Sequence, residues 1–149
     1  TPNSFSQVLP QIKKQTKGRL IHVFGSAGKR DVSKRKLMGQ ESSRFADVII
    51  LAPEDPRGED VSKINEQIAQ GFDEKFSLAN LENTKKELIF FSVPDRKEAV
   101  ELAINMAEAG DTVVVTGKGH ESSMNYGKGE IPWSEHQAVR EALGKRSLS

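Results

Sequence analysis

The chain has 149 residues, with 22 Lys and Arg against 21 Asp and Glu, a hydrophobic content of 36% and a mean hydropathy of −0.54. This nearly neutral, polar composition gives no indication of nucleic-acid or membrane binding, and the length suits one domain with a full core. The absence of cysteine excludes disulfides and thiolate metal sites, which fits a reducing compartment, and we expect a cytoplasmic protein. The chain lacks an initiator Met and opens on Thr-Pro, which favours a fragment of a longer protein.

Short apolar segments rich in β-branched residues predict buried strands. They cover residues 20–24, 48–51, 88–91 and 111–116. Amphipathic helices are expected between them, because capping residues and glycine stops bracket the intervening segments. The expected caps are Ser4, Asp60, Asp95 and Ser134, and the expected stops are Gly18, Gly71 and Gly110. Residues 72–87 are polar and poorly patterned, and we expect a loop there.

The alternation of strands with single helices predicts right-handed crossovers and therefore an α/β fold. We expect one three-layer, Rossmann-like domain over residues 1–149, with a mostly parallel sheet and helices on both faces. A small C-terminal hairpin is expected around residues 127–129. The last helix is expected to turn Ala138, Ala142 and Leu143 inward.

Polar residues follow three of the expected strands, in the segments 25–30, 53–60 and 117–121. A parallel sheet places such strand exits on one edge, where ligands of open α/β sheets bind. The first exit, Gly25 to Arg30, does not fit a phosphate loop, because two residues separate its glycines and Arg30 replaces the Ser or Thr that would hold Mg²⁺. We expect the basic run from Lys29 to Lys36 to be a solvated face, with Arg30 as the functional exception.

The three histidines are too scattered for a zinc site, and no metal site is expected. His22 lies in an apolar strand and is expected to be packed, whereas His136 is expected on the surface of the last helix. His120 lies in the third exit, where catalysis, ribose contact and loop orientation all remain open. Trp133 is expected to anchor packing. No Ser-His-Asp or Cys-His arrangement is present, so no catalytic residue is predicted.

Four segments carry a family resemblance. They are Thr1-Pro-Asn-Ser4, the segment 23–39 with Gly25-Ser-Ala-Gly-Lys-Arg-Asp31, Glu54-Asp-Pro-Arg57 and Gly117-Lys-Gly-His-Glu121. In this order and spacing they resemble the C-terminal domain of Mur ligases of the UDP-N-acetylmuramoyl-tripeptide synthetase type. Any one of these motifs alone is weak, but the four together span nearly the whole chain.

The resemblance implies a three-domain, ATP-dependent amide-bond ligase of peptidoglycan synthesis. Its substrates would be UDP-N-acetylmuramoyl-dipeptide, ATP and an amino acid, and its members form an acyl-phosphate that the amino acid attacks. ATP and Mg²⁺ would be bound mainly by a central domain outside this chain, so the chain alone is not expected to be catalytic. The alternative is a stand-alone Rossmann-like binding or interaction module that kept the fold without the reaction.

Carried over position by position, the resemblance also implies site residues. The implied contacts to the amino acid are Arg30, Asp55, Arg57, Gly117 and Glu121, with Glu54 and Pro56 in the same signature, and the implied contacts to nucleotide are Lys29, Asp31 and His120.

Two positions depart from the family pattern. Asp55 replaces the Asn that diaminopimelate-adding members carry, and Lys29 stands where an acidic residue is common. Arg57 keeps the feature associated with diaminopimelate rather than lysine.

Overall fold

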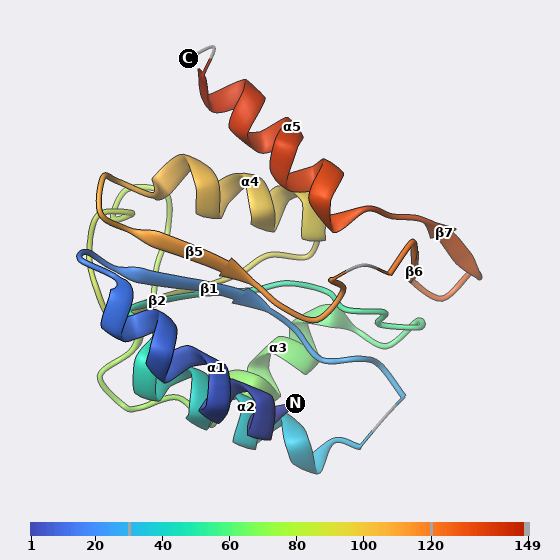
Figure 1. The fold of residues 1–149 in the computed structure, drawn as a ribbon. Coiled ribbons are helices and arrows are strands. Elements are labelled where there is room, and N and C mark those ends of the chain that lie inside the picture. The colour runs from blue at the N-terminus through green and yellow to red at the C-terminus, as the bar shows by residue number, and fades with distance from the viewer. Residues whose placement is uncertain (30, 120, 148–149) are drawn as a thin grey trace.

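The fold is built on a five-stranded sheet whose strands all run parallel (Figure 1). The structure is a computed structural model and describes residues 1–29, 31–119 and 121–147. The strand order is β3-β4-β2-β1-β5. The strands are β1 (Leu20–Phe24), β2 (Val48–Leu51), β3 (Ser77–Leu78), β4 (Ile89–Ser92) and β5 (Thr112–Val115). The predicted C-terminal hairpin is confirmed as the antiparallel pair β6 (Ser123–Asn125) and β7 (Glu130–Pro132).

Helices cover both faces of the sheet, which confirms the three-layer α/β architecture (Figure 1). One face carries α1 (Pro2–Gln15), α2 (Ser33–Phe45) and α3 (Val61–Ala69), and the other carries α4 (Arg96–Met106) and α5 (Glu135–Ser147). None of the helices in the described part of the chain combines the length and hydrophobicity needed to span a membrane.

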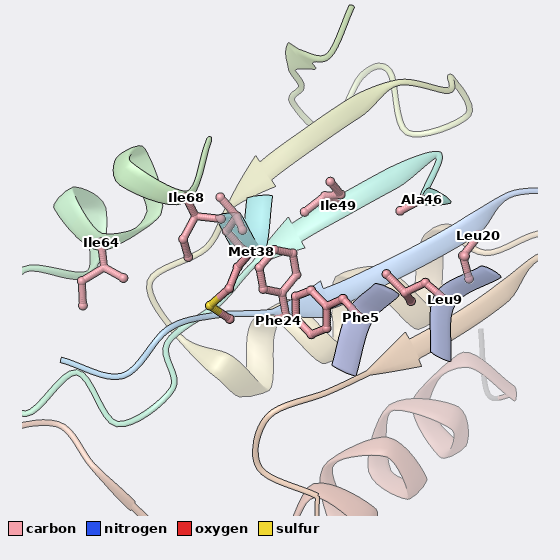
Figure 2. Close-up of a cluster of buried hydrophobic side chains, with 10 residues drawn as sticks. Phe5, Leu9, Leu20, Phe24, Met38, Ala46, Ile49, Ile64 and Ile68 are labelled. Atoms are coloured by element: carbon pink, nitrogen blue, oxygen red, sulfur yellow. The ribbon is translucent and has the colours of Figure 1, made fainter. Parts of the chain in front are cut away.

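The core has two layers because neighbouring residues of each central strand face opposite sides. Leu20 and Phe24 of β1 pack against Phe5 and Leu9 of α1, as Figure 2 shows. Ile21 and Val23, which alternate with them on β1, pack with β2, β4 and α4 on the other side. Burial on both faces is the reason that these strands are continuous apolar runs in the sequence. His22 is fully buried in β1, as predicted, with its ring stacked on Phe24.

Most predicted helix starts are confirmed, but the first is wrong. Asp60 and Asp95 cap α3 and α4, and the Ser134 hydroxyl accepts a hydrogen bond from the Gln137 backbone N–H. The cap of α1 is Thr1 rather than Ser4, because Pro2 already occupies the first turn and the Thr1 hydroxyl accepts from the Ser4 N–H.

Two further expectations about local structure need correction. The segment 72–87 is not only loop, because it contains the two-residue strand β3, which pairs with β4 at the edge of the sheet. Leu143 does not face inward: it is 52% exposed, whereas Ala138 and Ala142 pack against α4. The two small alanines allow α5 to pack against α4, and Leu143 lies outside that contact. Trp133 packs beside the same α4–α5 cluster, as predicted.

Candidate functional site

The three polar strand exits meet at one edge of the sheet, as predicted. The register places Phe24 beside Leu51 and Val23 beside Val115, so the exits of β1, β2 and β5 begin at the same level. The first and second exits are joined by a hydrogen bond from the Gly28 N–H to the Asp55 carbonyl, 2.9 Å long. The edge is therefore one continuous surface made of segments far apart in the sequence.

Glycine is required in the first exit because the second exit passes very close to it. A Cβ atom on Gly25 would lie 1.8 Å from the carbonyl oxygen of Ala52, and one on Gly28 would lie 1.8 Å from that of Pro56. Both obstacles are backbone atoms, which cannot move aside without shifting the loop. The glycine pair thus has a packing role that the sequence alone does not distinguish from phosphate binding.

The segment Asp55-Pro56-Arg57 adopts an unusual backbone conformation. Asp55 and Arg57 both have positive φ, 44° and 51°, on either side of a buried proline. Such conformations disfavour non-glycine residues and persist only where the surroundings hold them. Here the hairpin holds them, because the Arg57 N–H donates to the Asn125 carbonyl (3.0 Å) and the Asn125 N–H donates to Asp55 Oδ1 (2.8 Å).

A buried lysine connects the second and third exits. Lys118 Nζ lies 2.9 and 3.0 Å from the two carboxylate oxygens of Asp55, and 2.6 Å from Oε2 of Glu121. The Lys118 side chain is 1% exposed, whereas that of Glu121 is 54% exposed. Lys118 lies within the Gly117–Glu121 motif, but the sequence analysis predicts no role for it.

Arg57 keeps most of its hydrogen-bonding capacity. Its side chain is 29% exposed, and among the described residues its guanidinium makes one long hydrogen bond, 3.3 Å from Nη1 to the Gly28 carbonyl. The carboxylate of Asp55 lies 4.0 Å from Nη2. A guanidinium carries five N–H donors in a fixed fork, so several remain available to a carboxylate ligand.

Glu54 borders a cavity of about 620 Å³ beside the first exit. Burial raises the pKa of Glu54, although the nearby positive charges of Arg96 and Lys118 oppose this effect. Its carboxylate lies against Gly117, where φ is +113° and a Cβ atom would lie 2.8 Å from Glu54 Oε2. The cavity wall also contains Ser26, Ala27, Asp31, Lys34 and the first residues of α1.

The remaining expected site residues are Asp31, Lys29, Arg30 and His120. Asp31 lines the cavity, but its carboxylate already accepts hydrogen bonds from the hydroxyl and N–H of Ser33. Lys29 is exposed with φ of 54°, and its backbone N–H donates to Glu59. Arg30 and His120 lie outside the described residues, so their expected roles are not addressed by the structure.

Two arginines were missed by the sequence reasoning. Arg35, expected on a solvated face, is fully buried: it pairs with both carboxylate oxygens of Glu59 at 2.6 and 3.0 Å and donates to the Ala27 carbonyl of the first exit. Arg96 is equally buried and contacts the other two exits. The burial of each arginine depends on a partner carboxylate and on carbonyl acceptors that are distant in the sequence, which no local sequence pattern indicates.

Comparisons with known proteins agree on one family. A model of the Mur ligase, glutamate ligase domain, matches residues 1–119. A UDP-N-acetylmuramyl-tripeptide synthetase of Borreliella afzelii is 48% identical over 143 residues, covering 96% of this chain and 26% of that protein. A UDP-N-acetylmuramoyl-L-alanyl-D-glutamate–2,6-diaminopimelate ligase of Aquifex aeolicus is 40% identical over 144 residues, covering 97% of this chain and 27% of that protein.

A solved structure gives the same result for the fold. It is described as a UDP-N-acetylmuramoyl-L-alanyl-D-glutamate–2,6-diaminopimelate ligase, and it superposes with a TM-score of 0.85 at 32% sequence identity. The match covers all of this chain and 28% of the solved one. The chain therefore spans about a quarter of the length of the relatives it matches.

Proposed function

The chain belongs to the Mur ligase family, and we infer from this that it is the amino-acid-presenting domain of a longer, ATP-dependent ligase of peptidoglycan synthesis. The reaction we propose is addition of an amino acid to UDP-N-acetylmuramoyl-dipeptide, in the cytoplasm. The observation that carries the proposal is the meeting of the Glu54–Arg57 and Gly117–Glu121 segments at one sheet edge, joined by Lys118. The names of the relatives agree with this reaction.

The charges at this edge suit an amino acid with groups of both signs. The spare N–H donors of Arg57 favour a carboxylate, which they can bind in a bidentate manner. Glu54 and Glu121 provide negative charge for an ammonium group, and the bare backbone of Gly117 lets a ligand approach closely. With Asp55, Pro56 and Arg30 in the same loops, we propose that these residues form the amino-acid site, and that its ligand is a diamino acid such as diaminopimelate.

The chain has few groups that fit a nucleotide. Its glycine-rich exit lacks the spacing of a phosphate loop, and the cavity beside it carries Lys34 as a cation and Asp31 as an anion. Lys34 and Asp31 could therefore approach one end of ATP, and the family resemblance implies the same role for Lys29 and His120. ATP and Mg²⁺ would be held mainly by the rest of the ligase. ATP would supply the phosphoryl group that activates the carboxylate. This chain would bind and orient the amino acid whose amine attacks it.

The proposal is tested by Arg57→Ala in the longer ligase. A charge-assisted hydrogen bond contributes about 1.5–3 kcal/mol, so we expect kcat/KM for the amino acid to fall by about one to two orders of magnitude. The KM for ATP should stay nearly unchanged. Arg44→Ala is the matched control, because Arg44 is 60% exposed on α2 and its described contacts are with its own helix, an ion pair with Glu41 and the ring of Phe45. Equal effects of the two substitutions on the amino-acid kinetics would reject the proposed site.

A further inference from the structure

The ammonium group of Lys118 occupies the space between two carboxylates that come from different strand exits. Asp55 follows β2 and Glu121 follows β5, and the 2.6–3.0 Å distances to Nζ are those of charge-assisted hydrogen bonds. A lysine in a loop ordinarily extends into solvent, but this side chain is 1% exposed. Asp55 and Glu121 thus form an ammonium-binding site that is occupied by the side chain of Lys118.

The carboxylates of Asp55 and Glu121 differ in how many hydrogen bonds they accept and in how far they are exposed. Both oxygens of Asp55 accept from Lys118, Oδ1 also accepts from the Asn125 N–H, and the side chain is only 15% exposed. Glu121 is 54% exposed, and among the described residues it is held through Oε2 alone. Asp55 also lies 4.0 Å from Arg57 Nη2, so two cations face it, whereas Oε1 of Glu121 has no hydrogen-bond partner among the described residues and remains available to a ligand.

We propose that Lys118 is a positioning residue, which neutralises Asp55 inside the protein and aims Glu121 at the amino-acid ligand. The part that concerns the ligand rests on the proposed function. On this basis Asp55 acts through Lys118 and not by direct contact with the ligand's distal ammonium. Discrimination in favour of an ammonium-bearing side chain then belongs to Glu121, and the Asp that replaces the family's Asn at position 55 serves as the internal partner of the lysine.

The protonation of the cluster is consistent with a permanent structural role. Burial lowers the pKa of Lys118, but the hydrogen bonds to Glu121 and Asp55 outweigh this and leave it above its ordinary value. Burial likewise raises the pKa of Asp55, and the hydrogen bonds from Lys118 and Asn125 outweigh it in the opposite direction. Both groups therefore stay charged at neutral pH, and the contact does not act as a pH switch.

The first experiment replaces the missing group chemically in the 149-residue chain. Lys118→Ala removes three methylenes and the ammonium, which together correspond to propylammonium. We expect the substitution to lower Tm, and propylammonium chloride at several times its dissociation constant to raise the Tm of the variant by about 2–4 °C. The unchanged chain should not respond, and neither should Lys145→Ala, whose lysine pairs with Glu101 on the surface. Sodium chloride at the same concentration controls for ionic strength. A Tm response that is equal in all three proteins, or absent from Lys118→Ala, would reject the cluster.

The second experiment is a double-mutant cycle with Lys118→Met, which keeps most of the side-chain volume that Lys118→Ala removes. Lys118→Met removes the cation that lies between Asp55 and Glu121 and leaves Asp55 with only the more distant guanidinium of Arg57 among the described residues, so we expect a fall in Tm. Adding Asp55→Asn removes one of the two charges and should recover part of that loss. A double variant whose Tm loss equals the sum of the single losses would show that Lys118 does not neutralise Asp55.

Kinetics of the longer ligase then test the link to the ligand. We expect Lys118→Met to raise the KM for the amino acid about tenfold and to leave the KM for ATP unchanged, because Glu121 loses its orientation. If the thermal experiments succeed and the amino-acid KM does not move, the cluster exists but Glu121 does not contact the ligand, which contradicts the proposed site. If the thermal experiments fail, the role of Lys118 is wrong, whatever the status of the proposed function.

Discussion

Arg96 and Glu135 form a bidentate ion pair inside the protein, with 3.0 Å from Nε to Oε1 and 2.7 Å from Nη2 to Oε2. Arg96 also donates to the carbonyl oxygens of Pro53 and Thr116, at 3.1 and 2.8 Å. The first residue of α4 thus holds the β2 exit, the β5 exit and the first residue of α5 in one arrangement. Arg96, which is fully buried, therefore holds the β2 and β5 exits of the proposed site in place without being exposed at the site itself.

Removing Arg96 should destabilise the protein strongly. Arg96→Met leaves a buried carboxylate and two carbonyl groups without their donor, and breaking a buried pair costs about 3–5 kcal/mol of unfolding free energy. Urea denaturation followed by circular dichroism measures this loss. Lys97→Met is the matched control, because Lys97 is 49% exposed and its pair with Glu141 contributes about 0–1 kcal/mol.

A second variant distinguishes the broken pair from lost volume. Arg96→Met combined with Glu135→Leu removes both charges, and replacing a buried ion pair by apolar groups is often close to neutral. We therefore expect the double variant to recover part of the stability. A loss below about 1 kcal/mol in Arg96→Met alone would contradict the role assigned to this arginine.

Alanine at Gly28 should destabilise the site edge. The new Cβ would lie 1.8 Å from the Pro56 carbonyl oxygen, so the second exit must shift, and overpacking of this kind costs about 1–3 kcal/mol. Gly144→Ala is a control of opposite sign, because its Cβ would meet no atom of the described residues outside its own helix backbone within 4 Å, and alanine is favoured in a helix by up to about 1 kcal/mol. Melting temperatures of both variants provide the measurement. Unchanged Tm in Gly28→Ala would show that the two exits do not touch as described.

His22 should make the protein sensitive to mild acid. Burial, with smaller effects from the N-terminal ammonium and Arg96, lowers the pKa of His22 to about 3, against 6.5 in the unfolded chain. Between these values the unfolded state binds the extra proton. Unfolding free energy is therefore fully retained above pH 6.5 and falls by about 1.4 kcal/mol per pH unit below it, until pH reaches about 3.

The measurement is urea denaturation at several pH values between 7 and 4. His22→Gln keeps a polar group near Ser42 and Thr116, the two partners of the imidazole, and should show a shallower dependence on pH. His136→Gln is the control, because His136 is exposed on α5. Equal pH slopes in all three proteins would contradict the buried, neutral imidazole.

How far the sequence predicts this molecule depends on the range of the interaction that decides each feature. The central strands are apolar on both faces, and this local pattern identifies them and, through parallel pairing, the shared edge. The two-residue β3 has no such pattern, because its existence depends on pairing with β4. The cap at Thr1 was missed because Ser4 also fits a capping pattern, and only the chain geometry decides between them.

The same distinction applies within the site. The glycine-rich and Asp-Pro-Arg segments are visible in the sequence because their backbone requires special residues. The buried charges are not visible, since Arg96 and Glu135 are 39 positions apart and Lys118 and Asp55 are 63 positions apart. Burial of Lys118 becomes favourable only when both exits meet, and no property of residues 117–121 alone indicates it.

The isolated chain should bind free amino acid only weakly. The proposed ligand groups lie at an open edge, where Arg57 and Glu121 are 29% and 54% exposed, so water competes with each contact and screens it. The gain from binding must also exceed the loss of translational and rotational freedom, which is several kcal/mol. Strong binding would require the rest of the ligase to close over the edge and exclude water.

Isothermal calorimetry of the 149-residue chain with diaminopimelate should therefore give a dissociation constant weaker than about 1 mM, which corresponds to about 4 kcal/mol. Arg57→Ala should not change that result measurably, because little binding energy is present to lose. A micromolar dissociation constant that Arg57→Ala abolishes would contradict the need for closure while supporting the site itself.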